Sequence, residues 1–380
     1  MRRLHILLIL AITLTSALLY AAEAQKPAPA ATATAGFQGT GPLLGRGEDV
    51  GAPPMKLRWQ FRTSEADRAG VIGSPVIVKE TVYVADDKGF LHAIDLKSGK
   101  AKWKYESGDS FETTPLVMDG KILLGDLIGV FHAVSEDGKK VWTSDTEVGI
   151  HASANGIGDK VLFGNDGAEL ICLNVADGKQ VWKVKAGDRI NSAPSIGSGL
   201  AFFTGCDAQL RAIDVEKGEE KFAVDMGALS GGSPALVDDK LVIGTDGGRV
   251  ICVDLKSQKI DWTYEQVESG AMVFASPSVA DGVVVVGARD RYVHAIDLAT
   301  GQRKWAFKTR GDVDAPATIS AGRVYVGSKD RRMYVLDLKT GQPLWDFQAE
   351  RSIESAPAVA SGVVVLADSA GNVFCLEPQK

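Results

Sequence analysis

The sequence predicts an all-β fold, an eight-bladed β-propeller of four-stranded antiparallel blades, closed by an N-terminal outer strand that completes the C-terminal blade. The phrase AIDLKSGKAKW at 93–103 returns at 295–305 as AIDLATGQRKW, with weaker copies between them. An aromatic residue recurs every 39 to 44 residues, as expected for propeller repeats. Strand-like runs replace helical periodicity throughout. The aromatic markers are Trp59, Trp103, Trp142, Trp182, Phe222, Trp262, Trp305 and Trp345.

Residues 1–24 have the pattern of a signal peptide. Arg2 and Arg3 precede an apolar run to about Tyr20, and Ala22-Glu23-Ala24 is a small-x-small cleavage pattern. A retained membrane anchor is the alternative, which the short apolar run disfavours. No cysteine lies near the expected cut, so we expect no lipid anchor. The mature protein is expected in the periplasm or secreted.

Residues 25–54 are rich in Ala, Pro, Gly and Thr and hold too few large apolar side chains to build a core. We interpret them as a linker, either a tether or a strap over the domain, and place the propeller at 55–380. The chain has 42 basic and 48 acidic residues, a formal net charge of −6. Nucleic-acid-binding domains are usually basic, so we expect no nucleic-acid partner.

Within the first unit, four short runs at 74–78, 81–85, 90–95 and 101–106 are separated by turn residues. A lone strand at 57–61 precedes this unit, and the last unit stops after its third strand. The two incomplete sets add up to one blade, so the first strand is expected to close the ring and remove its open edge. We expect a monomer.

The repeated phrase combines a turn with an aromatic side chain that packs against the neighbouring blade. Its Asp and Ser/Thr-Gly shape the turn before the outermost strand, and its Trp packs against the neighbouring blade. A second marker begins each innermost strand. We align it as Ser74-Pro75, Thr114-Pro115, Ala154-Asn155, Ala193-Pro194, Ser233-Pro234, Ser276-Pro277, Ala315-Pro316 and Ala356-Pro357.

Cys172, Cys252 and Cys375 share one repeat position, where other copies carry alanine. A position shared with alanine is small and buried, and equivalent positions of different blades lie far apart. We therefore expect free core thiols. Cys206, in a turn, has no obvious partner.

The pattern A-x-D-x-x-[ST]-G-[KQ]-x-x-W, together with VYVGSKDRRMYVLD at 324–337, resembles the PQQ-type repeat over roughly 57–377. That superfamily includes quinoprotein dehydrogenases and non-enzymatic propellers similar to BamB, an outer-membrane-assembly lipoprotein. The BamB-like resemblance implies a scaffold with a protein partner in the cell envelope, and it is the interpretation we favour. The absent lipid-attachment cysteine departs from that branch.

Resemblance to the dehydrogenases would imply PQQ, calcium, an Asp base and a vicinal Cys-Cys pair. This chain has no Cys-Cys, few insertions and no C-x-x-C-H haem site. We therefore expect no catalytic residue, cofactor or metal. The alternative is a PQQ-dependent quinoprotein-like dehydrogenase, or a binder of a small alcohol or sugar.

Other candidate chemistry is weak. His92, His132 and His294 share one strand position, as expected for packed strand residues. His151 could face the channel, but no Ser or Cys is placed to pair with it. Asp312 and Asp314 are two carboxylates, too few for a calcium site.

Candidate binding residues lie where the copies differ. One of the two longer inter-blade loops, at 265–276, carries Met272, Val273 and Phe274, which could contact a partner or tuck into the channel mouth. Turns of the second to fifth units carry Asp126, Asp166, Asp207 and Asp246, whereas later units are basic. The basic side suits an acidic protein segment or an anionic glycan, unless Asp290 and Asp330 partner it as ordinary surface charge. The basic residues are Arg289, Arg291, Arg310, Lys329, Arg331, Arg332 and Arg351.

Overall fold

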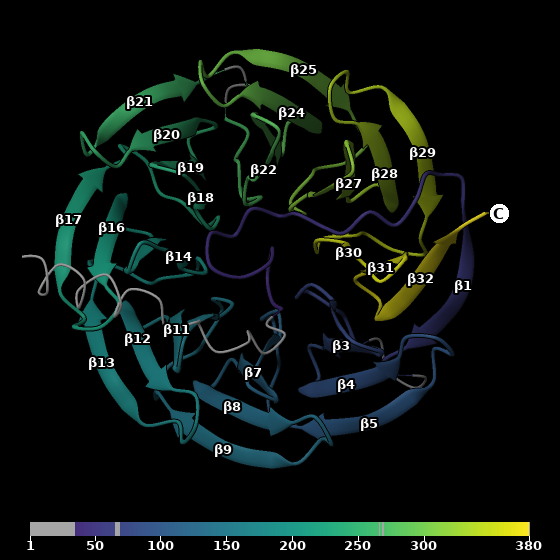
Figure 1. Cartoon of the computed structure of the whole chain (residues 1–380), viewed down its shortest axis with the longest axis horizontal. Coiled ribbons are helices and arrows are strands. Elements are labelled where there is room, and N and C mark those ends of the chain that lie inside the picture. Colours follow the sequence, from purple (N-terminus) through teal and green to yellow (C-terminus); the bar gives the residue numbers. More distant parts are fainter. Residues whose placement is uncertain (1–34, 65–68, 266, 268–269, 380) are drawn as a thin grey trace, which may run out of the picture. The chain divides into compact units, whose positions relative to one another are not determined.

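The computed structural model describes residues 35–64, 69–265, 267 and 270–379. These residues form a ring of eight four-stranded antiparallel sheets, the blades, around a central axis (Figure 1). The predicted eight-bladed propeller is confirmed. The expected signal peptide and residues 25–34 of the expected linker lie outside the described residues. Within the described ranges, no helix is long and apolar enough to span a membrane.

The strands of each blade are named in order from the central axis outward. Blade 1 contains β2 (Val76–Val78), β3 (Thr81–Ala85), β4 (Phe90–Asp95) and β5 (Ala101–Glu106). Blade 2 contains β6 (Leu116–Met118), β7 (Lys121–Gly125), β8 (Val130–Ser135) and β9 (Lys140–Asp145). Blade 3 contains β10 (Asn155–Ile157), β11 (Lys160–Gly164), β12 (Glu169–Asn174) and β13 (Gln180–Lys185). Blade 4 contains β14 (Ser195–Gly197), β15 (Leu200–Thr204), β16 (Gln209–Asp214) and β17 (Glu220–Asp225). Blade 5 contains β18 (Ala235–Val237), β19 (Lys240–Gly244), β20 (Val250–Asp254) and β21 (Lys259–Tyr264). Blade 6 contains β22 (Ser278–Ala280), β23 (Val283–Gly287), β24 (Tyr292–Asp297) and β25 (Arg303–Lys308). Blade 7 contains β26 (Thr318–Ser320), β27 (Arg323–Gly327), β28 (Arg332–Asp337) and β29 (Pro343–Gln348). Blade 8 contains β30 (Ala358–Ala360), β31 (Val363–Ala367), β32 (Asn372–Pro378) and β1 (Met55–Arg62).

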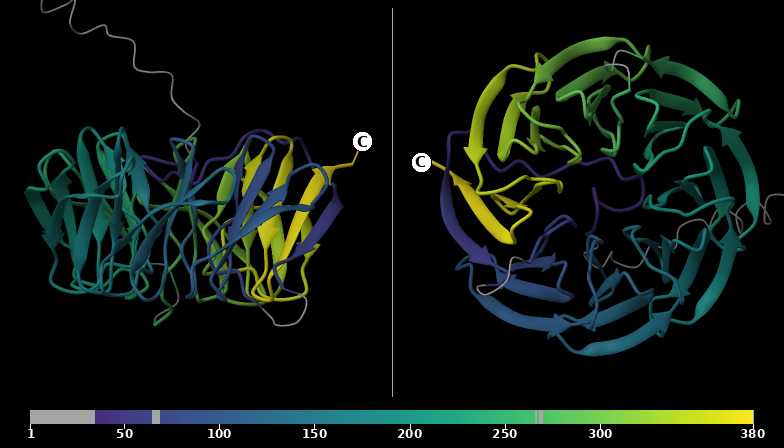
Figure 2. Two further views of the ribbon diagram at one scale, coloured as in Figure 1. Left: turned by 90° about the horizontal axis from the view of Figure 1, so that it is seen from below. Right: turned by 180° about the vertical axis from the view of Figure 1, so that it is seen from behind.

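The two ends of the propeller meet in blade 8. β1 pairs antiparallel with β32, from Met55 opposite Pro378 to Arg62 opposite Asn372. Figure 2 shows the two strands side by side on the circumference. On the axis side, the N–H of Ala356 in blade 8 donates to Ser74 Oγ of blade 1 at 3.0 Å. The ring is thus closed as predicted, at its inner and outer strands.

The core lies between neighbouring blades. Because blades stack face to face, their second and third strands are buried on both faces and read as continuous apolar runs, such as the fully buried VVVVG of β23. The outermost strands face solvent on one side and alternate, as β5 does. Between blades 2 and 3, the rings of Phe131 and Phe163 stack with centroids 4.1 Å apart.

The repeated Trp docks on the next blade. Each Trp side chain covers the turn glycine of the following blade, and its Nε1–H donates to a carbonyl there at 2.8 to 3.1 Å. A Cβ on Gly99, for example, would come within 2.6 Å of the Trp59 ring, so this turn requires glycine. The tryptophans that dock in this way are Trp59, Trp103, Trp142, Trp182, Trp262 and Trp305.

Two positions depart from this rule. Phe222 has no N–H to donate, and the turn that follows it in blade 5 carries Gln258 in place of glycine. Trp345 precedes blade 8, whose outermost strand is supplied by β1, so no such turn follows. It stacks on Phe347 instead, with ring centroids 6.4 Å apart. A docking Trp and a turn glycine in the next blade thus occur together, because the Trp ring packs directly on that glycine.

The strand register corrects the predicted alignment of the second marker at two blades. In blade 3 the equivalent of Ser74-Pro75 is Ser153-Ala154 and not Ala154-Asn155, because Asn155 begins β10. In blade 7 the equivalent pair is Pro316-Ala317 and not Ala315-Pro316. Ala317 O accepts a hydrogen bond from Ser278 of blade 6, just as Pro357 O of blade 8 accepts one from Thr318 of blade 7, so Ala317 and Pro357 are equivalent. A Ser-Pro pair is therefore an unreliable marker for aligning the innermost strands, because the fold requires neither residue type before these strands.

The cysteines behave as predicted. Cys172, Cys252 and Cys375 are free and fully buried on equivalent strands, and Cys206 is free and partly exposed. Burial raises the pKa of each of the three core thiols to about 12. These thiols are therefore packing residues.

Candidate functional site

Residues 35–54, hereafter the strap, run around the inside of the ring and then outward to β1 (Figure 2). Within the ring, strap carbonyls accept backbone N–H groups from the innermost strands of five blades. Ala35 O bonds Val117. Gly41 O bonds Ile196, Pro42 O bonds Leu236, Leu44 O bonds Val279, and Gly45 O bonds Ile319. Of the two possibilities raised by the sequence, the described residues of this segment form a strap.

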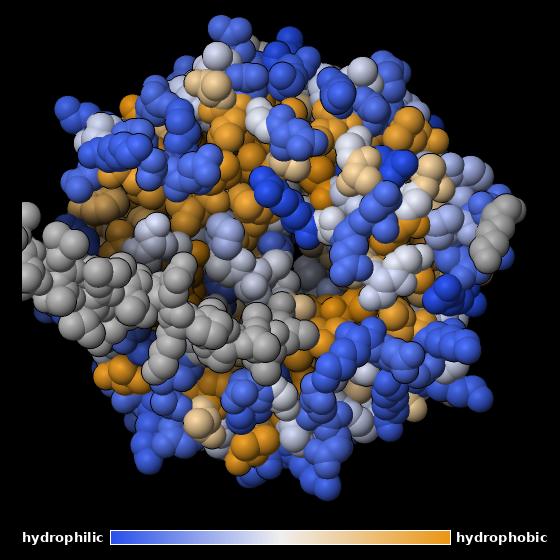
Figure 3. Space-filling model, in the orientation of Figure 1, coloured by the Kyte–Doolittle hydropathy of each residue, from blue (hydrophilic) through white to orange (hydrophobic). Residues whose placement is uncertain are grey.

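The strap's small residues allow this close approach. A Cβ on Gly47 would lie 2.7 Å from the carbonyl oxygen of Val359, and one on Gly36 would lie 2.9 Å from Leu116 Cδ1. Blade 3 joins through a side chain, since Asn155 Nδ2 donates to Gly41 O at 2.8 Å. Figure 3 shows this face of the molecule, with hydrophilic residues crowding the circumference and hydrophobic residues gathering nearer the strap.

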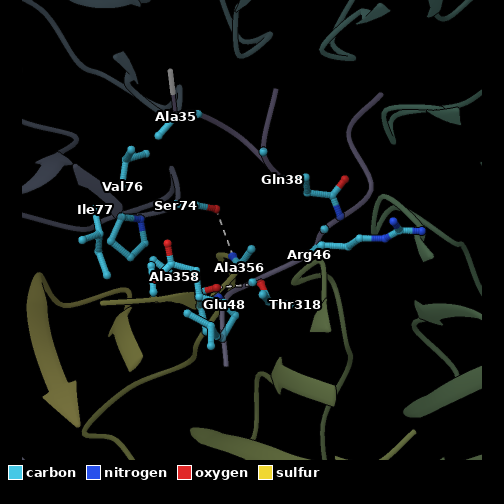
Figure 4. Close-up of a pocket in the computed structure, with 18 of the residues that line it drawn as sticks. Ala35, Gln38, Arg46, Glu48, Ser74, Val76, Ile77, Thr318, Ala356 and Ala358 are labelled. Atoms are coloured by element: carbon cyan, nitrogen blue, oxygen red, sulfur yellow. Dashed lines mark hydrogen bonds between the residues drawn. The ribbon is translucent and has the colours of Figure 1, made fainter. Parts of the chain in front are cut away.

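One gap remains beside the strap. In most other blades, the residue equivalent to Ile77 forms a backbone hydrogen bond with the strap. Ile77 of blade 1 forms none with the described strap residues. A pocket of about 450 Å³ lies there, between β2, β30 and the strap. Figure 4 shows Val76 and Ile77 on one side and Gln38 and Arg46 on another. Arg46 Nε donates to Val279 O at 2.8 Å, which fixes this side chain at the pocket.

The opposite face, hereafter the loop face, carries the loops between blades and the turns between second and third strands. Its channel mouth holds a cavity of about 160 Å³ whose lining includes Phe37, Glu112 and His151. Phe37 comes from the strap and narrows the channel from within. His151 Nδ1 lies 3.2 Å from Asp166 and Nε2 lies 3.6 Å from Glu112. These three side chains are partly exposed and form a group of ionisable contacts at the channel mouth.

The three histidines that share one strand position, His92, His132 and His294, are buried structural residues, as predicted. His132 and His294 are buried, and each Nε2 contacts the turn carboxylate of its own blade at 2.9 Å. Each Nδ1 contacts a tyrosine hydroxyl from the preceding blade, Tyr105 at 3.0 Å and Tyr264 at 2.9 Å. With Nε2–H donated to the carboxylate, Nδ1 of the neutral ring accepts from the phenol. These triads bind one blade to the next.

The 265–276 loop divides the apolar candidates. Val273 is fully buried in the core between blades 5 and 6, so it offers no surface to a partner. Met272 is 36% exposed, and Phe274 is partly buried at the channel mouth. The guanidinium of Arg289 lies 4.3 Å from the Phe274 ring centroid, a cation–π contact. Within this loop, Val273 is therefore part of the core, and the Met272 side chain is accessible to a partner.

The inner basic residues are neutralised within the protein. Asp314 Oδ2 contacts Arg289 at 2.9 Å and Lys329 at 2.7 Å. Burial alone would raise the pKa of Asp314, but hydrogen bonds from the two cations outweigh burial and hold the pKa below its usual value. Arg332 likewise pairs with Asp346. These three cations are structural partners of local carboxylates.

The outer basic residues are different. Arg291, Arg310, Arg331 and Arg351, hereafter the arginine sector, are exposed, and their side chains form no ion pair among the described residues. Their backbones are nevertheless fixed. Arg291 O accepts from Thr309, Arg331 O accepts from Ala349, and the N–H of Arg310 donates to Asp330. The sector lies on neighbouring turns of blades 6, 7 and 8.

The predicted acidic turns are more varied than their spacing indicates. Asp126 is fully buried against His132, so it adds no surface charge. Asp207 contacts Arg211 at 2.6 Å. Asp166 and Asp246 remain partly exposed. The acidic character of this half thus rests on fewer side chains than the sequence indicates.

The described residues do not fit a calcium-bound quinone. Among them, no three His, Cys, Asp or Glu side chains converge as metal ligands. Asp314 already pairs with two cations of the protein, Arg289 and Lys329. Asp312 therefore has no uncommitted carboxylate beside it with which to bind calcium. Phe37 occupies space at the channel mouth.

The closed ring, the docked Trp and the repeated turn together define the class: the chain is a propeller of the PQQ-repeat superfamily, of the BamB-like branch. The model of the family described as outer membrane protein assembly factor BamB matches residues 56–147, 128–272, 220–324 and 267–380. The chain belongs to this family.

Curated relatives are similar over part of their length. The serine/threonine-protein kinase AfsK of Streptomyces coelicolor is 27% identical over 46% of this chain and 21% of its own length. Quinohemoprotein alcohol dehydrogenase ADH-IIG of Pseudomonas putida is 24% identical over 40% of this chain and 24% of its own. BamB of Burkholderia pseudomallei is 26% identical over 50% of this chain and 41% of its own. The chain thus spans less than half of each of these relatives.

Solved structures share the fold. BamB from Moraxella catarrhalis superposes with a TM-score of 0.70 at 15% identity, covering 85% of this chain and 100% of the other. Quinohemoprotein alcohol dehydrogenase from Comamonas testosteroni gives 0.74 at 14% identity, covering 86% and 78%. One fold thus serves an assembly factor and an enzyme, so function must be argued from the site.

Proposed function

We propose that the protein is a non-catalytic scaffold of the cell envelope that binds a protein partner on its loop face. The observation that carries the proposal is the strap, which bonds the innermost strands and places Phe37 in the channel mouth. Catalysis on the axis would need an open, ligand-lined pocket there. The exposed loops of the loop face offer a surface for recognition by another protein.

Membership of the BamB family supports the same proposal, because that family is described as an outer membrane protein assembly factor. The expected signal peptide would deliver the chain to the periplasm. There, the exposed Met272 and the unpaired arginines supply apolar and charged contacts of the kind used in protein interfaces. We propose no cofactor and no metal.

Site-specific photo-crosslinking in the native cell envelope tests this function. A photoreactive residue at Met272 or Arg291, on the loop face, is expected to capture one discrete protein. The same residue at Val141 or Val181, exposed on the circumference, is the control and is expected to capture none. Equal capture at all four positions, or none at the loop-face positions, would contradict the proposal.

A further inference from the structure

We infer that the arginine sector is a docking surface for an acidic segment of a protein partner. The inference rests on the proposed function and names the chemistry of the partner at that surface. Arginine's planar fork matches carboxylates in a bidentate way, which lysine cannot reproduce.

Three carboxylates near the sector are already engaged with other groups. Asp290 contacts His294 Nε2 at 2.9 Å, and Asp330 accepts from Tyr334 Oη at 2.6 Å. Glu350 pairs with Arg62 at 3.0 Å. This outcome answers the alternative raised by the sequence, in which Asp290 and Asp330 partner the basic residues. Each of the two carboxylates has a hydrogen-bond partner within its own blade.

Backbone conformation gives an independent indication. Arg291 and Arg331 have φ of 68° and 73°, in the left-handed region that disfavours side chains with a Cβ. Both occupy the residue before the third strand of their blade. The equivalent residue elsewhere is glycine at 89, 129, 248 and 371 and alanine at 168 and 208. The other copies thus carry glycine or the smallest side chain with a Cβ, whereas the two large cations stand there at a conformational cost. Strain of this kind gathers at functional sites.

The sector repeats across two blades. Arg291 O accepts from the N–H of the residue before Arg310, and Arg331 O accepts from the N–H of the residue two before Arg351, so the backbone places these arginines in two neighbouring pairs along the chain. A short acidic segment crossing blades 6 to 8 would meet both pairs. Met272 lies nearby, since its carbonyl accepts from the N–H of Arg289, and it offers an apolar contact.

A short protein segment fits better than an extended polyanion. The chain carries a net charge of −6, and the other half of the loop face holds Glu112, Asp166 and Asp246. A nucleic acid or an anionic membrane would extend over that half and be repelled. An acidic peptide can be confined to the basic half.

The test measures binding of a fluorescein-labelled 12-residue peptide, (Glu-Ala-Glu-Leu) repeated three times, by fluorescence anisotropy. The full mature chain is compared with the double variant Arg291→Gly/Arg331→Gly. The matched control is Lys139→Gln/Lys179→Gln, which also removes two cations, from exposed turns before outermost strands. Because glycine suits the turn, the arginine variant is expected to keep or raise the melting temperature.

We expect the arginine variant to bind roughly ten-fold more weakly and the control to stay within about two-fold, from two lost charge-assisted contacts. Arg291→Lys/Arg331→Lys should recover only part of the affinity. Equal loss in both doubles, absence of binding to the parent chain, or tighter binding of single-stranded DNA or anionic vesicles than of the peptide would overturn the inference. If this test fails while loop-face crosslinking succeeds, the proposed function stands without this partner chemistry.

Discussion

Replacing Tyr264 by phenylalanine isolates one hydrogen bond between two blades. Tyr264 is 2% exposed, and its hydroxyl lies 2.9 Å from His294 Nδ1. Burial raises the pKa of Tyr264 to about 12, so the phenol remains a donor at neutral pH. Phenylalanine keeps the ring and leaves a buried imidazole nitrogen without its donor. The expected loss of unfolding free energy is about 1–3 kcal/mol.

Blade 1 supplies the matched comparison. There, Phe61 already occupies the tyrosine position, with ring centroids 5.7 Å from His92 and planes at 66°, against 5.7 Å and 68° for Tyr264 and His294. The reciprocal Phe61→Tyr variant should gain up to about 1 kcal/mol. Urea unfolding, followed by tryptophan fluorescence, measures both. A Tyr264→Phe variant as stable as the parent chain would refute the claim that these triads bind the blades together.

Three further predictions concern packing. Cys172, Cys252 and Cys375, with pKa values raised to about 12 by burial, should not react with a thiol reagent in the folded protein, leaving Cys206 as the single reactive thiol; a second fast thiol before denaturation would contradict this. Trp59→Ala should cost about 3–5 kcal/mol in thermal or urea unfolding, and Phe222→Ala clearly less, because Phe222 is only partly buried and donates no hydrogen bond. Gly47→Val should displace the strap, because its Cβ would meet Val359 O at 2.7 Å; faster hydrogen exchange at the Ile319 amide reports this, and unchanged protection would show that the strap tolerates the side chain.

The fold could be predicted from sequence because one packing unit repeats. Trp needs a glycine in the next blade's turn, and Trp, with 7 copies in the chain, is rare enough to mark the repeats in the sequence. The closing strand was predictable too, because 57–61 lacked a blade of its own. The innermost strands were harder to align. They are three residues long, and their neighbours are joined by hydroxyls or backbone carbonyls that many residues can supply.

The candidate site was predictable in part. Seven cations could be read from the turns, but which of them are neutralised depends on contacts such as that of Arg289 with Asp314, 25 residues away. Val273 read as a partner contact, yet the fold places it in the core. The strap's route leaves little trace in sequence, because most of its bonds use backbone atoms and only its glycines reflect the close approach.

A titration of the mature protein with PQQ and calcium tests the central claim, that this propeller binds a partner and does not catalyse. Quinone absorbance and melting temperature would be followed together, with alcohols or sugars and a redox dye added afterwards. The account predicts no saturable binding, no rise in melting temperature and no dye reduction. Saturable binding with a raised melting temperature and substrate-dependent dye reduction would contradict it.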